Sequence, residues 1–207
     1  MSQSIRASIP FEKGWRFHRG EVPVEALAWG NRNLIANETR VWQKADNHGL
    51  SKPENPASDS WRVVTLPHDF VIEGEFTAKA PLNNGSLPGG KGTYLKKFEL
   101  AAEDAGRRFH LEFDGVYRDC VVHVNGHFIG RHLDGYTSFG YDISEVCRFG
   151  GLNAVTVAVD ASENELWSYE GGGSYRGVRL VMTAPVFIPR WGVCVRANAA
   201  KNPGHLP

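Results

Sequence analysis

The stretch RRFHLEFDGVYRDCVVHVNGHFIGRH, residues 107–132, decides the fold that the sequence predicts. In its first half, apolar Phe109, Leu111 and Phe113 alternate with polar residues. Side chains of a β-strand point to opposite faces in turn, so this pattern predicts a strand with one buried face. The polar residues predicted to face the other way are Arg108, His110 and Glu112.

The second half of the stretch predicts a β-hairpin. Two runs rich in β-forming residues meet at Asn125-Gly126. This dipeptide favours the positive φ angles of a type I′ turn, the usual connection of a two-residue hairpin. We therefore expect two antiparallel strands within residues 116–132.

Further strand patterns occur along the chain without helical patterns between them, which favours an all-β, antiparallel jelly-roll β-sandwich. Residues 20–60 and 71–93 interrupt these patterns with Asn, Gly and Pro. The first of these is expected to be a long, insertion-like loop with a short helix near 22–36. The other predicted strands are residues 93–100, 153–160, 178–183 and 186–196.

Composition argues against two classes of function. The chain has 207 residues, with 23 Lys plus Arg against 23 Asp plus Glu, so no basic surface suggests a nucleic-acid partner. No apolar run is long enough for a membrane span, and the start lacks the apolar core of a signal peptide. We expect one domain over residues 1–207, without a membrane partner.

The cysteines indicate a reducing compartment. Cys120, Cys147 and Cys194 are far apart and odd in number, so buried free thiols are expected rather than disulfides. This usage favours a cytoplasmic protein. A periplasmic or secreted location stays open, because a leader could have been removed.

Two glycine-rich stretches do not match phosphate-binding loops. GSLPGGKGT, residues 85–93, resembles such a loop, but a strand pattern follows it where a helix N-terminus is required. GGGSYR, residues 171–176, has Arg176 where the third glycine of a dinucleotide fingerprint belongs. Neither stretch predicts a nucleotide cofactor.

The histidines and carboxylates give no catalytic or metal site. His68 and Asp69 are adjacent in LPHDF and no G-x-S-x-G occurs, so a turn in which both bond to backbone is expected. No H-x-x-x-H pair suggests a metal. Asp114 and Asp142 lie at strand-to-turn junctions, where carboxylates usually accept backbone N–H groups. We therefore predict no cofactor.

Trp167 and Tyr169 lie directly before the glycine run in LWSYEGGGSYRGVRL, residues 166–180. Their ring faces suit the C–H face of a pyranose. The same residue types are also routine in protein cores, and the pattern alone leaves both alternatives open. The glycines are interpreted as a tight bend that carries no side chains.

The order of these segments resembles the N-terminal sugar-binding domain of glycoside hydrolase family 2, most of all its β-galactosidase branch. The resemblance covers about residues 11–196 and implies a galactose-binding-like jelly roll. The segments that carry it are LPHDF (66–70), GTYLKKFEL (92–100), LEFDGVYRDCVVHVNGHFIGRHLDGYTSFGYDIS (111–144), GGLNAVTVAVD (150–160), LWSYEGGGSYRGVRL (166–180) and PVFIPRWGV (185–193).

The resemblance also implies a function. In the family this domain precedes an immunoglobulin-like domain and a catalytic TIM barrel, neither of which this sequence contains, so no catalytic residue is expected here. Two positions depart from the family pattern, Ser168 between the aromatic residues and Ser174 at a usually apolar place. The implied contacts to a β-galactoside are Asn83, Asn84, Trp167, Tyr169 and Glu170.

Two other functions remain possible from the sequence. One is a free-standing, lectin-like module that binds sugar by itself. The other is a domain that only associates with other domains. Binding of galactose by the isolated chain would favour the first, and exposed apolar patches at one edge would favour the second.

Overall fold

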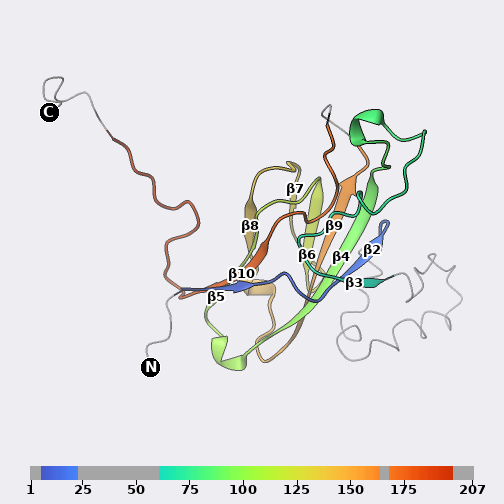
Figure 1. Cartoon of the computed structure of the whole chain (residues 1–207). Helices are drawn as coiled ribbons and strands as arrows, with labels where there is room; N and C mark the ends of the chain where they lie inside the picture. Colours follow the sequence, from blue (N-terminus) through green and yellow to red (C-terminus); the bar gives the residue numbers. More distant parts are fainter. Residues whose placement is uncertain (1–5, 23–60, 164–167, 198–207) are drawn as a thin grey trace, which may run out of the picture.

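The computed structural model describes residues 6–22, 61–163 and 168–197, and its strands form two layers (Figure 1). Every pairing among the described strands is antiparallel, which confirms the predicted β-sandwich. The four-stranded sheet has the order β1-β10-β5-β8, and the six-stranded sheet has the order β3-β2-β4-β9-β6-β7. No helix in these ranges is long and apolar enough to cross a membrane.

The chain crosses between the two sheets several times. The strands are β1 (Arg6–Pro10), β2 (Trp15–Arg19), β3 (Arg62–Val64), β4 (Gly90–Leu100), β5 (Arg108–Phe113), β6 (Cys120–Val124), β7 (His127–His132), β8 (Phe139–Asp142), β9 (Gly151–Ala161) and β10 (Val178–Thr183). The short 3₁₀ helices are η3 (Leu82–Asn84), η4 (Ala102–Asp104) and η5 (Ser144–Val146).

Most of the predicted strands are confirmed. β5, the β6–β7 hairpin and β10 lie where the sequence pattern places them, and β4 and β9 pair along their whole length. β4 starts at Gly90, inside the glycine-rich stretch that resembles a phosphate loop. That stretch therefore leads into a strand, as expected. The helix predicted near 22–36 falls outside the described residues.

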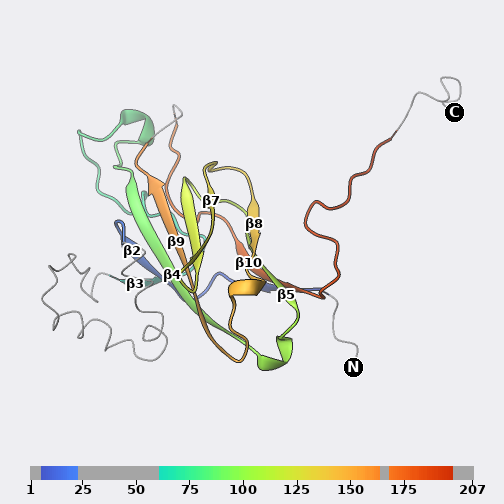
Figure 2. The ribbon, with the colours of Figure 1, turned by 180° about the vertical axis from the view of Figure 1, so that it is seen from behind.

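The strand predicted at 186–196 is wrong. This segment is not part of either sheet: Phe187 and Arg190 still contact the four-stranded sheet, and the chain after them leads away from the sandwich (Figures 1 and 2). Its alternating apolar residues stay exposed, with 70% of Trp191, 67% of Val193 and 89% of Val195 accessible. Alternation alone does not form a strand, because a strand also needs a neighbour for its backbone hydrogen bonds.

The two sheets bury aromatic and β-branched side chains between them. Trp15 is fully buried, and its indole N–H donates to the Phe11 carbonyl at 2.7 Å. Phe113 and Phe139 stack with ring centroids 4.8 Å apart, and β9 contributes three valines from one face. Burying the indole N–H without a partner would cost free energy of desolvation, and the hydrogen bond to the Phe11 carbonyl offsets that cost.

The burial of Glu112 differs from the prediction. The alternation in β5 is right, but Glu112 is 7% exposed rather than solvated. Guanidinium groups from three separate segments surround its carboxylate: Arg6 at 3.7 Å, Arg190 at 3.5 Å and Arg179 at 3.9 Å. Long arginine side chains thus cover the outer face of the four-stranded sheet, and they compensate the buried charge.

The two carboxylates predicted to be structural have different partners. Asp142 accepts the backbone N–H of Ser144 at 3.0 Å, as expected. Asp114 instead forms a bidentate salt bridge with Arg179, with N–O distances of 2.6 and 2.7 Å. This pairing lowers the pKa of the Asp114 carboxyl.

The cysteines are free within the described residues. Cys120 is buried and Cys147 is half-buried, and burial raises the pKa of each thiol to about 12. Cys194 is exposed, so the prediction of buried thiols is wrong for this residue. It lies in the segment that does not join a sheet.

Asn125 and Gly126 form the predicted turn, with φ angles of 52° and 82°. Asn125 is also 3% exposed, and its side chain joins three parts of the chain. Its amide donates to the Val146 carbonyl and to Asn153 Oδ1, both at 2.8 Å, and its Oδ1 accepts the Ala154 N–H at 3.0 Å. The residue therefore fixes the hairpin to β9 and η5.

Asn125→Gly keeps the positive φ but removes these hydrogen bonds, so it should lower the free energy of unfolding by about 2 kcal/mol. Asn125→Pro should cost more, because proline cannot adopt a positive φ. Urea unfolding measures both variants, with the exposed neighbour His127→Ala as control, expected within about 0.5 kcal/mol of wild type. An unchanged midpoint for Asn125→Pro would contradict this account of the hairpin.

Candidate functional site

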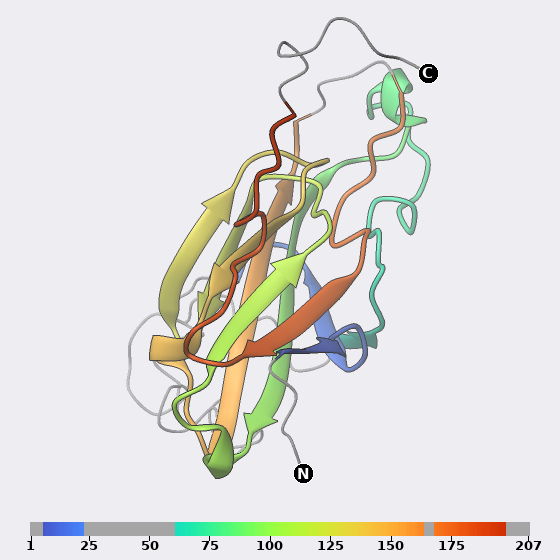
Figure 3. The same ribbon diagram turned by 90° about the vertical axis from the view of Figure 1, so that its left-hand side faces the viewer.

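The candidate site lies at one end of the sandwich. Gly90 at the start of β4 pairs with Ala161 at the end of β9, and Cys120 at the start of β6 pairs with Val159. The loops beside these strand ends therefore gather here, among them residues 71–89 and 168–177. Figure 3 shows η3 and the chain from residue 168 onward side by side at this end.

The glycine run is held between two other segments. His68 N–H donates to the Ser174 carbonyl and Phe70 N–H to the Gly172 carbonyl, both at 2.8 Å. On the other side, Tyr117 N–H donates to the Gly173 carbonyl at 2.9 Å. LPHDF and the glycine run are therefore hydrogen-bonded neighbours, although they are far apart in sequence.

Glycine is required here by close packing. A Cβ on Gly172 would lie 2.6 Å from Val71 Cγ2, and a Cβ on Gly173 would lie 2.3 Å from the Tyr94 hydroxyl. Gly173 also has a φ of 126°, a conformation that side chains strongly disfavour. The run is thus a paired segment between its neighbours, with Gly173 in an antiparallel bridge to Tyr117, rather than the predicted tight bend.

Asp69 connects these segments through its side chain. Its Oδ1 accepts the N–H of Val71 at 2.9 Å and that of Gly172 at 3.0 Å. Its Oδ2 accepts the hydroxyl of Tyr169 at 2.7 Å. The sequence predicts that Asp69 bonds to backbone groups. It does not predict the hydrogen bond between Asp69 and Tyr169, because no local pattern links these two residues.

Tyr169 is 41% exposed, so it is not a core residue. Partial burial of the phenol and the neighbouring Asp69 carboxylate raise the pKa of Tyr169. The hydroxyl is therefore a neutral donor that is already engaged with Asp69, while part of the residue faces solvent.

Asn84 holds the next residue of the run. Its Oδ1 accepts the N–H of Glu170 at 3.3 Å, and its amide donates to the Leu87 carbonyl at 3.0 Å. Asn84 is 1% exposed, whereas Asn83 is half-buried. The structure thus brings Asn84, Tyr169 and Glu170 together, and Trp167 lies outside the described residues.

Two tyrosines lie beneath this end. Burial, together with the Glu170 carboxylate, raises the pKa of Tyr117. The Tyr94 hydroxyl lies 2.8 Å from His68 Nδ1, and the other ring nitrogen of His68 lies 3.2 Å from Glu73. Burial lowers the pKa of His68, so the neutral ring is favoured. The prediction that His68 bonds to backbone through its side chain is wrong.

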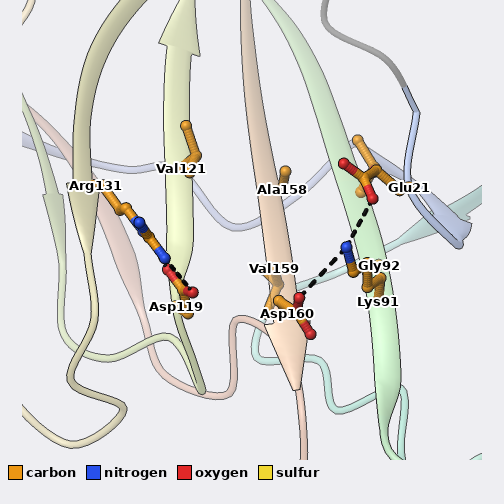
Figure 4. A pocket seen from close by; sticks show the side chains of 10 residues that line it. Glu21, Lys91, Gly92, Asp119, Val121, Arg131, Ala158, Val159 and Asp160 are labelled. Carbon is orange, nitrogen blue, oxygen red and sulfur yellow. Dashed lines mark hydrogen bonds and ion pairs between the residues drawn. The ribbon is translucent and has the colours of Figure 1, made fainter. Parts of the chain in front are cut away.

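A hollow of about 200 Å³ lies elsewhere, on the outer face of the six-stranded sheet (Figure 4). Val121 and Ala158 lie between its two charged walls. Each wall is an internally paired group: Arg131 with Asp119, and Lys91 with Glu21 and Asp160. Because these charges satisfy one another, the hollow offers little unpaired recognition chemistry.

No group of three metal-binding side chains occurs in the ranges that the structure describes. The candidate site is therefore the end at Tyr169, with its aromatic ring, amide and carboxylate groups. Such groups, placed beside a closely packed glycine run, suit a small hydroxylated ligand.

Comparison with known proteins agrees with this geometry. The sequence model described as "Glycosyl hydrolases family 2, sugar binding domain" matches residues 76–183. The chain belongs to glycoside hydrolase family 2. This confirms the resemblance drawn from the sequence, and the matched residues contain Asn83, Asn84, Tyr169 and Glu170.

Two similar proteins are named for two different activities. A β-galactosidase of Bacteroides ovatus is 42% identical over 201 residues, which cover 95% of this chain and 20% of the relative. A putative β-glucuronidase of Formosa agariphila is 33% identical over 144 residues, which cover 68% of this chain and 14% of the relative.

A β-glycosidase structure from Bacteroides vulgatus has the same fold, with a TM-score of 0.68 and 30% identity. The match covers 88% of this chain and 21% of that one. This chain thus spans about a fifth or less of the length of these family 2 relatives.

Ser174 departs from the family 2 pattern and is 2% exposed. Its hydroxyl has no hydrogen-bond partner among the residues that the structure describes. Ser144 offers a contrast: its buried hydroxyl accepts the Phe109 N–H at 2.8 Å and donates to Asp142 at 2.6 Å.

We expect Ser174→Ala to raise the free energy of unfolding by about 1 kcal/mol, because it removes an unpaired buried hydroxyl. Ser144→Ala should instead lower it by about 1–2 kcal/mol, because it breaks two bonds. Urea unfolding of the two variants provides the measurement. Equal destabilisation by both would show that Ser174 has a partner.

Proposed function

We propose that this chain forms a non-catalytic wall of the sugar pocket of a β-galactosidase-type glycoside hydrolase. One observation carries the proposal: Tyr169, Asp69, Asn84 and Glu170 meet at one end of a family 2 sugar-binding domain. The 42% identity to a β-galactosidase over 95% of the chain supports the sugar class.

The chemistry of the wall suits a pyranose. A partly exposed tyrosine ring offers an apolar face, and its oxygen reaches a hydroxyl at the edge of the sugar. Glu170 and Asn83 are proposed to add polar groups, and Trp167 is proposed as a second stacking surface. Asn84 supports the wall from inside, through its bond to the Glu170 backbone.

The proposal gives this chain no catalytic residue. Glycoside hydrolysis uses two carboxyl groups that flank the scissile bond. Asp69, the carboxylate at the centre of the wall, already accepts three hydrogen bonds from the protein. The catalytic pair is proposed to lie in a partner domain.

Exposed apolar residues support such a partner. In the loop between β3 and β4, Ile72 is 65% exposed, Phe76 79% and Leu82 86%. Large apolar side chains exposed on one loop suit a contact with another protein domain. The loop also carries Asn83 and Asn84, so association and sugar contact are proposed to occur at the same end.

The test joins this chain to a catalytic partner, in place of the matching part of the Bacteroides ovatus β-galactosidase. Tyr169→Phe removes one hydrogen-bonding oxygen and should lower kcat/KM for a nitrophenyl β-galactoside by about tenfold. The matched control, Tyr141→Phe, removes a hydroxyl from β8 and should leave kcat/KM within about twofold.

Calorimetry on the 207-residue chain alone separates the alternatives. Half a pocket offers too few contacts to offset the entropy of binding, so no saturable heat with galactose or lactose is expected. Sub-millimolar binding that Trp167→Ala abolishes would contradict the proposal and favour a lectin-like module. An unchanged kcat/KM for Tyr169→Phe in the joined enzyme would contradict it as well.

A further inference from the structure

The hydroxyl of Tyr169 has a fixed direction. It lies 2.7 Å from Asp69 Oδ2, and a carboxylate accepts hydrogen bonds but does not donate them. The phenol must therefore direct its proton to Asp69. The phenol oxygen still has a lone pair that can accept a hydrogen bond from a ligand, so Tyr169 acts as an acceptor toward the pocket.

Asp69 cannot easily turn away to release that proton. Its other oxygen is fixed by the N–H groups of Val71 and Gly172, at 2.9 and 3.0 Å. The backbone at Gly171 packs so closely that a Cβ there would lie 2.5 Å from Asp69 Oδ2. The carboxylate is thus held by backbone on two sides.

The charges near Tyr169 disfavour an anion. Asp69 lies directly behind the hydroxyl, and Glu170 is the next residue along the chain. Two arginines at this end are engaged within the protein: Arg62 contacts Glu73 and His68, and Arg19 donates to the carbonyls of Phe70, Pro88 and Gly89.

We propose that Asp69 is a positioning residue that makes Tyr169 an acceptor, so that this wall favours a neutral sugar hydroxyl and disfavours a uronic acid carboxylate. This inference rests on the function proposed above and adds a ligand class to it. A sugar hydroxyl can donate to Tyr169, whereas a carboxylate would place a second acceptor and a like charge against it.

Asp69→Asn is the decisive variant. The asparagine oxygen can still accept the two backbone N–H groups, while its amide donates to Tyr169 and frees the phenol proton to point toward the ligand. The substitution also removes a negative charge. The affinity of this wall for a carboxylate ligand should therefore rise, while the backbone changes little.

The measurement uses the joined enzyme described above and two competitive inhibitors, methyl β-D-galactoside and methyl β-D-glucuronide. Because the catalytic partner is the same in all variants, a change in the ratio of the two inhibition constants reports on this wall. Asp69→Asn should lower the preference for the galactoside by about tenfold. Asp119→Asn, a matched surface carboxylate paired with Arg131, should leave the ratio within about twofold.

A second measurement on the 207-residue chain tests the hydrogen bond without sugar. The ¹³C resonance of the Tyr169 phenol Cζ, assigned with Tyr169→Phe, should shift in Asp69→Asn because the phenol no longer donates to a carboxylate. An unchanged resonance in a folded variant would overturn the inference.

The outcomes separate the two proposals. If Tyr169→Phe weakens binding but Asp69→Asn leaves the inhibitor ratio unchanged, the inference is wrong and the proposed function stands. If Tyr169→Phe has no effect on either inhibitor, both are wrong. A wild-type preference that falls in Asp69→Asn supports both.

Discussion

Asp69 accepts hydrogen bonds from Val71, Gly172 and Tyr169, and so joins the segment before β4 to the segment after β9. The two segments lie about a hundred residues apart in the chain. Residues that project from loops are placed accurately only when the loops are fixed to each other. Without this carboxylate, the segment that presents Tyr169 and Glu170 would keep its backbone hydrogen bonds and the Asn84 bond to Glu170, but the Tyr169 hydroxyl would lose its partner.

The glycine run makes this link possible. Since Gly172 and Gly173 carry no Cβ, LPHDF approaches closely enough for two backbone hydrogen bonds on one side, and Tyr117 pairs with the run on the other. Close packing then leaves the neighbouring Tyr169 and Asn84 with defined partners. The three successive glycines therefore allow close packing of the proposed binding wall and do not indicate chain flexibility.

The sequence predicts the sandwich because its strands carry local signals. Alternation identifies β5 and β10, and Asn125-Gly126 identifies the β6–β7 hairpin. Alternation fails at 186–196, where apolar residues recur at every second place but no neighbouring strand supplies hydrogen bonds. It also fails to predict the burial of Glu112, because the covering arginines come from other segments of the chain.

The site was predictable only in part, for a related reason. The resemblance to family 2 identifies Asn84, Tyr169 and Glu170, which the structure brings together. Asp69 was interpreted as a residue of an isolated turn, because its partners Gly172 and Tyr169 become neighbours only after the chain has folded. The sequence likewise predicts the turn conformation of Asn125, but it does not predict the hydrogen bonds of Asn125 to Asn153 and Val146. Long-range hydrogen bonds leave no periodic signal.

The central claim is that the end of the sandwich at Tyr169 forms part of a sugar pocket. A crystal structure of this chain joined to the catalytic part of a family 2 β-galactosidase, with a galactoside bound, tests the claim most directly. The account predicts a sugar hydroxyl within hydrogen-bonding distance of the Tyr169 oxygen, while Asp69 keeps its bond to that tyrosine. A sugar bound away from Tyr169, or in the hollow between Arg131 and Lys91, would contradict it.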